Sequence, residues 1–280
     1  MIALLTDFGT RDPYVAAMKG VIASRCDAAV HDVTHDIAPF DVFGAAWFLR
    51  AVASYWPRGT IFVCVVDPGV GTSRQIVALE HEGRIFVAPD NGLLTFASIP
   101  LERRAPSPAE FHATDSAGEA PAAPTVFAVT NDAFFLPHGS DTFHGRDRFA
   151  PVAAAIANGI PLAELGPPMP SLVRLQYDSP QYGESVVRGT IVASDRFGNL
   201  ITDVERARIP FPRFLLRAHG VEIERLERTY GGAAPGPFLI VGSTGCIEIS
   251  VANASAAERL QLRRLDRVEL WPNDAESSSF

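Results

Sequence analysis

The sequence has few cysteines, no long apolar run and no basic leader before its first aspartate. Its three cysteines, Cys26, Cys64 and Cys246, form no CxxC pair, which argues against both a disulfide framework and a zinc knuckle. No stretch approaches the roughly 18 apolar residues that a membrane-spanning helix needs. We therefore expect a soluble, cytoplasmic protein with no membrane partner.

Basic charge is also scarce. Lysine and arginine total 24 against 32 aspartate and glutamate residues, so the formal net charge is −8, and Lys19 is the single lysine. Nucleic acids and anionic membranes recruit surfaces rich in lysine and arginine. The charge balance therefore argues against a nucleic-acid partner, whereas it is compatible with a small cationic ligand.

The composition favours a large folded core with many loops. The chain has 280 residues, of which 47% are hydrophobic and 20% charged, so it can bury a sizeable core and intrinsic disorder is excluded. The 22 glycines and 22 prolines are too many for a helical bundle and follow no fibrous repeat. These features favour an α/β or mixed fold.

Short β-type runs alternate with helical segments over residues 1–160. Strands that alternate with helices imply a mainly parallel sheet with helices on both faces. Ligands of such sheets bind at the carboxyl ends of the strands. We expect strands at 2–5, 29–33, 60–66, 75–79, 84–87 and 125–129, and helices at 14–26, 40–56 and 148–158.

The character of the sequence changes near Ile160. We predict an α/β domain over residues 1–165, a proline-rich linker over 166–183 and a smaller all-β, barrel-like domain over 184–280. The third part consists of short β-type segments separated by glycine, asparagine or proline. Its strands are expected at 185–194, 200–204, 213–218, 221–226, 237–241, 246–251 and 267–271, with one helix at 256–262.

Polar residues gather directly after two apolar strands of the first domain. Asp7 and Asp12 lie in the segment DFGTRDPY, where spacing alone favours Asp12 or Thr10 as a helix cap over a ribose or ammonium contact. Asp67 follows the strand TIFVCVV and precedes Arg74, which indicates either a held carboxylate or an ion pair that braces the loop. Neither segment contains a GxGxxG or Walker motif.

Residues of metal-binding type occur in the segments TFHGRD and HDVTHD. Neither segment has an HExxH motif or a cysteine partner, and Asp147 is better explained as a helix cap. We therefore predict no metal site. In the second domain, the segments DRFGN and GSTG are typical of turns, although Phe197 could stack on a base.

Together these segments resemble one enzyme family, the S-adenosylmethionine (SAM) hydrolases that form adenosine. They are also called SAM hydroxide adenosyltransferases and are relatives of the fluorinating and chlorinating SAM enzymes. The resemblance implies an α/β domain, a β-barrel-like domain and a homotrimer with each site between two subunits; it implies no cofactor. The matching motifs, which span nearly the whole chain, are TDFGTRDPYVAAMKG, VDPGVGTSR, APDNGLL, TFHGRDRFAPVAAAIANG, SDRFGNLITD and GSTGCIEI.

The resemblance also implies roles for individual residues. Asp67, Arg74 and His144 match a catalytic triad around the nucleophilic water. The implied substrate contacts are Asp7 to the ribose diol, Asp12 to the methionine ammonium, Ser243 to the methionine carboxylate, Trp47 and Phe197 as aromatic walls, Asn199 at the adenine edge, and Phe143 and Asp195 as further contacts.

The chain departs from its relatives at several of these positions. Asp67 stands where the halogenating relatives have a tyrosine, and Gly145 stands where the fluorinating ones have a halide-binding serine. A carboxylate repels a halide ion, so these two residues favour water as the nucleophile. Near the C-terminus, the family's N-x-G-N run is replaced at Ala252, Ala254 and Ser255, which leaves adenine contacts there to the backbone.

The chemistry requires help only for the nucleophile. Attack of water on the 5′ carbon of SAM expels neutral methionine from a sulfonium, so the leaving group needs neither an acid nor a metal. If Arg74 pairs with Asp67, the carboxylate is a poor base, and either His144 accepts the proton or Arg74 acidifies the water itself.

We therefore expect hydrolysis of SAM to adenosine and methionine. Three alternatives stay open, in decreasing order. They are a non-catalytic protein that binds SAM or adenosine, a halide-using SAM adenosyl transferase, and a metal-dependent hydrolase built on His35, Asp36 and His144.

Overall fold

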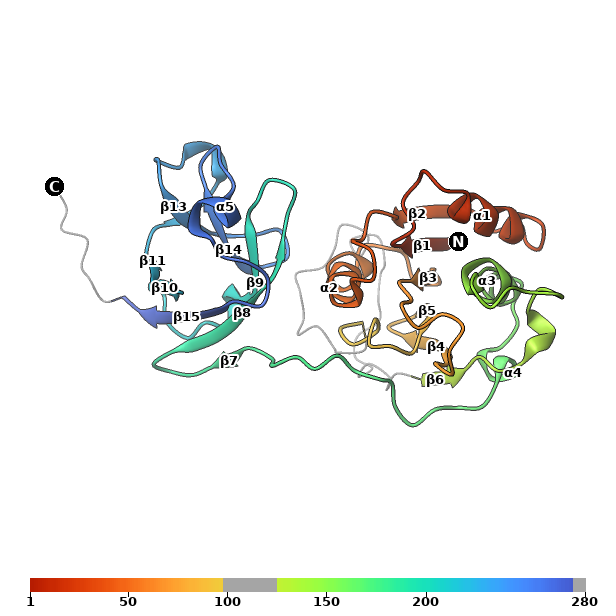
Figure 1. Ribbon diagram of the computed structural model, residues 1–280. Helices are drawn as coiled ribbons and strands as arrows, with labels where there is room; N and C mark the ends of the chain where they lie inside the picture. Colours follow the sequence, from red (N-terminus) through yellow and green to blue (C-terminus); the bar gives the residue numbers. More distant parts are fainter. Residues whose placement is uncertain (98–124, 274–280) are drawn as a thin grey trace. The chain divides into compact units, whose positions relative to one another are not determined.

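The computed structural model describes residues 1–97 and 125–273 and divides the chain into two compact units, Met1–Gln176 and Tyr177–Phe280 (Figure 1). Each unit has its own sheet and its own hydrophobic core. The expected architecture of two domains, the first with helices and the second mostly β, is confirmed at this level. Within the described ranges, no helix is both long and apolar enough to span a membrane.

The first unit is built on a six-stranded mixed sheet with the strand order β2-β1-β3-β5-β4-β6. The pairs β1–β2, β1–β3 and β3–β5 are parallel, as expected, whereas β4 runs antiparallel to both β5 and β6. The strands are β1 (Ile2–Thr6), β2 (Val30–Thr34), β3 (Ile61–Val65), β4 (Ile76–His81), β5 (Arg84–Pro89) and β6 (Thr125–Ala128).

A two-residue turn explains why β4 is reversed. Glu82 and Gly83 join β4 to β5 and have φ angles of 50° and 70°, and His81 pairs directly with Arg84 across the turn. Two successive positive φ angles are typical of a type I′ turn, which joins antiparallel strands and places glycine where other residues are strained. The mainly parallel arrangement therefore holds for β2, β1, β3 and β5 but not for β4.

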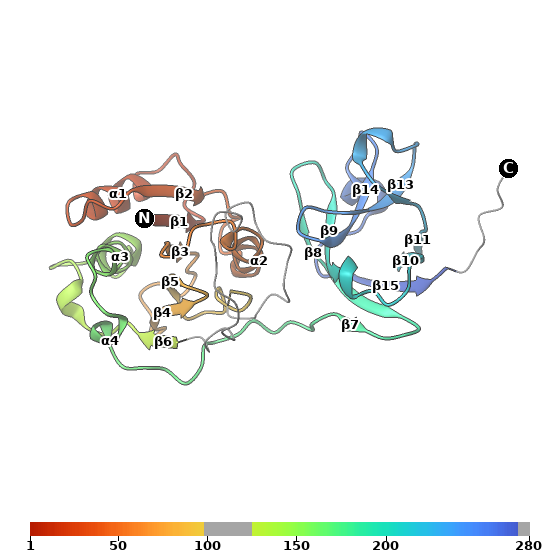
Figure 2. The same cartoon turned by 180° about the vertical axis from the view of Figure 1, so that it is seen from behind.

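Helices cover both faces of this sheet (Figure 2). Ile2 and Leu4 of β1 belong to the core formed with α1 and α3, whereas Ala3 and Leu5 belong to the core formed with α2. Because successive strand residues point to opposite faces, a strand buried on both sides has a continuous apolar sequence. The helices are α1 (Tyr14–Ala23), α2 (Val42–Ala53), α3 (Ala150–Ala157), preceded by a π-helical turn η3 (Gly145–Phe149), and α4 (Leu162–Leu165).

The segment that follows α4 packs against the first unit. Met169 N donates to Val126 O at 2.8 Å, and Leu175 N donates to Thr95 Oγ1 at 2.9 Å. These bonds lie within residues 166–183, the range for which we expected a linker from its prolines. Residues 166–176 are therefore part of the first unit in the structure, because their backbone donors find partners on it.

The second unit is one long, curled and largely antiparallel sheet. Its order is β11-β10-β15-β8-β9-β14-β13-β12, with β7 paired to β8, and β11 comes back to contact β13. One face encloses a core that includes Val187, Leu216 and Ile249. The elements are β7 (Gln181–Tyr182), β8 (Val187–Ser194), β9 (Leu200–Glu205), β10 (Phe214–Ala218), β11 (Val221–Ile223), β12 (Leu226–Glu227), β13 (Pro237–Val241), β14 (Cys246–Val251), α5 (Ala256–Leu260) and β15 (Arg267–Pro272).

Candidate active site

An ion pair between Asp67 and Arg74 lies on the loop that joins β3 to β4. Arg74 Nε is 2.9 Å from each carboxylate oxygen of Asp67, and Arg74 Nη2 also donates to Asp67 Oδ2. Only 5% of the Asp67 side chain and 9% of the Arg74 side chain are exposed. A planar guanidinium can hold both carboxylate oxygens at once, which a lysine ammonium cannot.

The motif APDNGLL braces this loop from the neighbouring strand. Asn91 Nδ2 donates to Val66 O at 2.9 Å, directly before Asp67, and Asp90 N donates to Gln75 O at 2.9 Å, directly after Arg74. Because β3 and β5 are parallel, their carboxyl ends meet at one edge of the sheet. The ion pair is therefore held at the edge where α/β proteins bind their ligands.

His144 extends the ion pair to a third residue. Its Nδ1 lies 2.9 Å from Arg74 Nη2, although the two residues are 70 positions apart in the chain, and only 2% of the residue is exposed. Its Nε2 is buried and has no hydrogen-bond partner among the described residues. Burial lowers the pKa of His144, and the positive charges of Arg148 and Arg74 lower it further.

Asp147 braces the loop around His144 and does not cap a helix. Its Oδ2 accepts from Ser140 N at 2.7 Å, and its Oδ1 accepts from Arg146 Nε at 2.6 Å. Neither η3 nor α3 has a side-chain cap. The expectation of a helix cap at Asp147 is therefore wrong, because the carboxylate finds a charged partner and a backbone donor within the loop.

His35 belongs to a separate hydrogen-bonded chain. Its Nδ1 lies 2.8 Å from Thr6 Oγ1, its Nε2 lies 2.9 Å from Asp32 Oδ1, and Asp32 Oδ2 accepts from Lys19 Nζ at 2.7 Å. Both ring nitrogens of His35 are thus engaged by protein groups. Within the described residues, no group of three or more histidine, cysteine, aspartate or glutamate residues is placed to hold a metal ion.

Asp7 and Asp12 lie at the start of the chain's first loop. Asp7 is half-buried and accepts a hydrogen bond from Phe40 N at 2.8 Å through Oδ2. Asp12 is exposed, and α1 begins after Pro13 without a side-chain cap. The expectation that Asp12 or Thr10 caps this helix is therefore wrong. Pro13 occupies the N-cap position, and the Asp12 side chain is exposed to solvent.

The aromatic residues Trp47 and Phe40 differ sharply in exposure. Trp47 is 5% exposed, its ring packs edge-on against Phe96 with centroids 5.6 Å apart, and Arg50 covers it at 4.9 Å. Phe40 is 71% exposed, has a φ of 67° and bonds to Asp7 through its amide. Trp47 therefore offers little surface to a ligand, and Phe40 is the aromatic residue beside Asp7 that sequence reasoning missed.

An aromatic cluster lies next to His144. The rings of Phe8, Tyr14 and Phe143 contact one another, with centroids 5.1 to 6.1 Å apart. A Cβ at Gly145 would lie 3.1 Å from Phe143, 3.2 Å from Met18 Sδ and 3.3 Å from Phe8. Glycine at position 145 thus lets the cluster close over the backbone, so no side chain stands there to hold a halide.

In the second unit, Asp195 organises the turn between β8 and β9. Its Oδ1 accepts from Phe197 N at 2.9 Å and from Asn199 N at 2.8 Å, and its Oδ2 accepts from Asn199 Nδ2 at 2.8 Å. Asn199 is buried by this arrangement, whereas Phe197 is 79% exposed. The structure therefore brings three of the expected substrate contacts into one turn, with the aromatic ring free to meet a flat ligand.

Glu248 is a buried acid in the second unit that sequence reasoning missed. It lies on β14 two positions after Cys246, and Tyr230 OH donates to its Oε2 at 2.8 Å. A Cβ at Gly242 would overlap its carboxylate, so the acid lies directly against the turn that carries the exposed Ser243. Burial raises the pKa of Glu248, the Tyr230 bond lowers it in part, and the negative charge of Asp195 raises it again.

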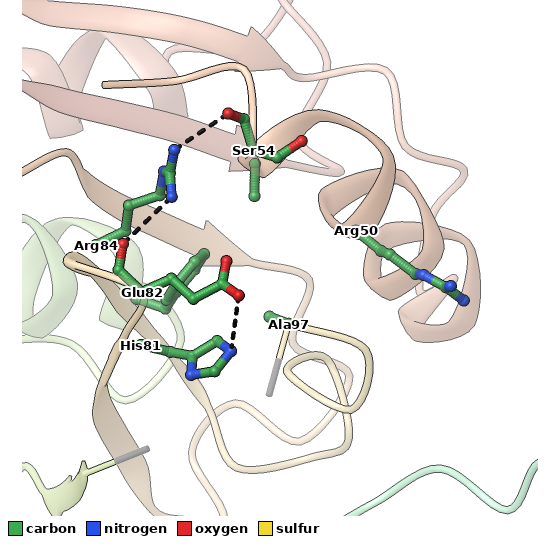
Figure 3. Close-up of a pocket in the computed structure, with 8 residues that line it drawn as sticks. Arg50, Ser54, His81, Glu82, Arg84 and Ala97 are labelled. Carbon is green, nitrogen blue, oxygen red and sulfur yellow. Dashed lines mark hydrogen bonds and ion pairs between the residues drawn. The ribbon is translucent and has the colours of Figure 1, made fainter. Parts of the chain in front are cut away.

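The first unit has a small cavity (Figure 3). It is lined by residues that include Ser54, His81, Glu82 and Arg84. His81 ends β4 and Arg84 begins β5, whereas Asp67 follows β3 and Arg74 precedes β4, so the cavity is at the opposite edge of the sheet. Arg84 donates to Ser54 O at 3.1 Å, to Trp56 O and to Glu82 O, which identifies it as a brace for the backbone.

Family models match both units. The model of the SAM hydroxide adenosyltransferase N-terminal domain matches residues 2–166, and the model of the C-terminal domain matches residues 189–269.

Curated relatives and a solved structure resemble the chain over most of its length. An (R)-S-adenosyl-L-methionine hydrolase from Thermus thermophilus is 39% identical, with 94% of this chain and 96% of the relative aligned. A fluorinase from an Actinoplanes species is 30% identical over 74% of this chain and 72% of its own. The crystal structure of an uncharacterized conserved protein from Thermotoga maritima has a TM-score of 0.81 at 31% identity and covers 96% of this chain and 100% of its own.

Proposed function

Because the chain belongs to the SAM hydroxide adenosyltransferase family, we propose that it hydrolyses S-adenosyl-L-methionine to adenosine and L-methionine. The observation that carries this proposal is the buried network of Asp67, Arg74 and His144 at the carboxyl edge of the sheet. Relatives at 36% to 39% identity bear the name (R)-S-adenosyl-L-methionine hydrolase. We therefore take the (R) diastereomer of SAM as the preferred substrate.

The reaction is a displacement at the ribose 5′ carbon. A bond forms between the water oxygen and C5′, the C5′–S bond breaks, and its electron pair stays on sulfur, which leaves as neutral thioether. The second proton of the attacking oxygen goes to solvent. A positively charged substrate and an anionic nucleophile lose their charges together, so a site from which water is excluded favours the transition state. Holding the oxygen in line with the departing sulfur supplies a further part of the rate.

The first unit supplies the nucleophile and part of the nucleoside contacts. Asp67 fixes Arg74, and Arg74 and His144 face the attacking oxygen. Asp7 accepts from the ribose diol, and Phe40, rather than the buried Trp47, forms the aromatic wall beside it. Asp12, exposed at the same loop, pairs with the methionine ammonium, and the Phe143 cluster closes the side of the pocket next to His144.

The second unit supplies recognition of the adenine and of the amino acid. Phe197 stacks on the base, Asn199 reads its edge, and Asp195 keeps both in place through the turn. Ser243 binds the methionine carboxylate. The active form is a homotrimer, which light scattering on the purified protein tests directly.

Water is preferred over halide as the nucleophile. The Asp67 carboxylate repels an anion that lacks a proton to share, and Gly145 presents no hydroxyl group. The fluorinase relatives make a halide-using transferase the second candidate.

The decisive experiment is incubation of the purified protein with the separated (R) and (S) diastereomers of SAM, followed by chromatography of the nucleosides. Parallel reactions contain a chelator, fluoride or chloride. We expect adenosine and methionine, faster from the (R) diastereomer and unchanged by the additives. A 5′-halogenated nucleoside would establish the transferase, loss of activity with the chelator would establish a metal enzyme, and binding without methionine release would leave a binding protein.

A further inference from the structure

We infer that His144 acts as a neutral hydrogen-bond donor through Nε2, and not as the base that removes a proton from water. This inference rests on the proposed function for its role in the reaction, but the state of the ring follows from the structure alone. It assigns the proton of the imidazole and identifies the buried group that touches the nucleophile.

The partner of Nδ1 determines where the ring proton lies. Arg74 Nη2 is 2.9 Å from His144 Nδ1, and a guanidinium nitrogen can only donate a hydrogen bond. Nδ1 must therefore present its lone pair. In a neutral imidazole with Nδ1 unprotonated, the proton is on Nε2.

The surroundings keep the ring neutral. A proton on Nδ1 would point at the Arg74 guanidinium, and Arg148 of η3 adds a second positive charge. The negative groups that face His144 are Asp67, Asp141 and Asp147. Asp67 is bound by Arg74, so its negative charge mainly offsets the positive charge of that arginine. Together with burial, the arginines lower the pKa of His144 below its ordinary value.

Asp147 gives His144 little negative charge to pair with. Arg146 donates to both of its carboxylate oxygens, at 2.6 and 2.9 Å, and Ser140 N donates to it as well. Of the three carboxylates near His144, Asp67 and Asp147 are paired with arginines, and among the described residues Asp141 forms no such pair. The balance of charge around the ring remains unfavourable to an imidazolium.

The unpartnered Nε2 of His144 is the ring nitrogen available to donate a hydrogen bond to a ligand. Nε2 is buried and has no partner among the described residues, and a buried N–H without an acceptor destabilises the fold. An acceptor supplied by a ligand removes this cost at His144, whose other ring nitrogen is already bound by Arg74. The acceptor in the reaction is the attacking oxygen, which becomes more negative as it loses its proton.

This assignment changes the order of proton transfer. Water loses its proton to solvent before the attack, and the resulting hydroxide accepts the Nε2–H bond beside the positive Arg74. The oxygen then bonds to C5′ while the C5′–S bond breaks and the electron pair remains on sulfur. Asp67 and His144 both keep their protonation states, so the enzyme returns to its starting form when the products leave.

The first test measures the ring directly. Long-range ¹H–¹⁵N NMR of the full-length protein labelled at histidine, between pH 6 and 9, should show Nε2 protonated and Nδ1 unprotonated for His144. The signal is assigned by its loss in His144→Gln. A protonated Nδ1, or a transition to the imidazolium within this range, would overturn the inference. The result does not depend on catalysis, so it stands even if the protein fails to hydrolyse SAM.

The second test separates a donor from a base with matched variants. Glutamine at position 144 brings an amide N–H near the position of Nε2 but accepts no proton, whereas asparagine reaches only the position of Nδ1. We expect His144→Gln to keep kcat within about tenfold and His144→Asn to lose about 10²- to 10³-fold, the usual effect of removing one donor to a developing oxyanion. Equal and large losses in both variants would identify His144 as the base, and equal activity in both would remove it from the reaction.

The pH profile provides an independent readout. We expect kcat to rise with pH along one limb, without a falling limb below about pH 9, because no group acts as an acid. The rise in kcat reports the loss of a proton from the water, so it should persist in His144→Gln. Disappearance of the limb in this variant would show that it reports the titration of His144. Unfolding curves and SAM binding by calorimetry verify that each variant is folded.

Discussion

Asp67 in the first unit and Asp195 in the second are both carboxylates that follow a strand, yet the structure uses them differently. Asp67 is bound by the Arg74 guanidinium, and Nη2 of that guanidinium also reaches His144, whose Nε2 is unsatisfied. Asp195 is bound by the backbone and amide of its own turn. The first arrangement is a buried, charged network that ends at an unsatisfied ring nitrogen, whereas the second holds the shape of a turn; under the proposed function the first serves the reacting oxygen and the second binds the nucleoside.

The two regions also differ in exposure. His144 is 2% exposed and Phe197 is 79% exposed. A buried polar group that lacks a partner is costly unless a ligand supplies one, while an exposed ring on a rigid turn gains contact area when a flat ligand arrives. The comparison predicts that mutations in the first region lower kcat and that mutations in the second raise KM.

The largest effect is expected for Asp67→Ala. It leaves Arg74 buried without its anion, so kcat should fall by at least about 10²- to 10³-fold, and the free energy of unfolding should fall by about 3–5 kcal/mol. Steady-state kinetics and denaturant unfolding measure the two effects. Asp178→Ala, which breaks an exposed pair with Arg267, is the matched control and should change neither. If Asp67→Ala kept most of its activity, the contrast between the two aspartates would disappear.

Asp195→Ala should give the next largest effect. It removes three hydrogen bonds that hold Phe197 and Asn199, so KM for SAM should rise about tenfold or more while kcat changes little. Asp195→Asn keeps an acceptor for the two backbone donors and should recover part of the affinity. A drop in kcat as large as that of Asp67→Ala would mean that the second unit takes part in the chemistry.

Phe40→Ala and Trp47→Ala distinguish a ligand wall from a core residue. Phe40 is exposed, so its removal should raise KM several-fold with little change in stability. Trp47 is packed against Phe96, so its removal should cost about 3–5 kcal/mol of unfolding free energy. Calorimetric binding of SAM and thermal unfolding measure both variants. The reverse pattern would restore Trp47 as the pocket wall.

The smallest effect is a pH dependence of stability that originates at Glu248. Its pKa is raised in the folded protein, so the folded state keeps the proton to higher pH than the unfolded chain does. Glu248 therefore lowers stability as pH rises from the ordinary glutamate range through the raised value. Thermal unfolding at pH 5 and pH 8 should show a smaller decrease in Glu248→Gln than in the wild type.

Tyr230→Phe is the companion variant for this measurement. It removes the hydrogen bond that stabilises the Glu248 carboxylate, so it should enlarge the loss of stability with rising pH. An unchanged profile in both variants would exclude Glu248 as the origin of the dependence.

Local patterns predicted most of the fold. The apolar strands β1 and β3 lie where the sequence places them, because continuous apolar runs that are buried on both sides are recognisable from composition alone. The reversal of β4 depended on a positive φ at Glu82, which cannot be predicted from a glutamate in the sequence. The packing of residues 166–176 on the first unit depended on partners far away in the chain, such as Val126 and Thr95.

The candidate site could be predicted in part. Motif order indicated the family, and the family models confirm that prediction. The resemblance implied Trp47 as an aromatic wall, and that role stays a prediction; the structure packs Trp47 against Phe96 and leaves Phe40 beside Asp7. The sequence did not reveal that Glu248 is buried. An acid that alternates with apolar residues is typical of a strand with one exposed face, whereas every residue of β14 is buried in the structure.

The sequence by itself determined the family, the two-part architecture and the identity of the residues that could react. Those properties depend on residue order and short-range periodicity, which the chain carries without folding. Only the tertiary structure decided that Arg74 Nη2 meets His144 Nδ1 across 70 residues, and hence that the free nitrogen of the ring is a donor. The reason is physical: a histidine's proton is assigned by its neighbours, and neighbours distant in sequence exist only once the chain has packed.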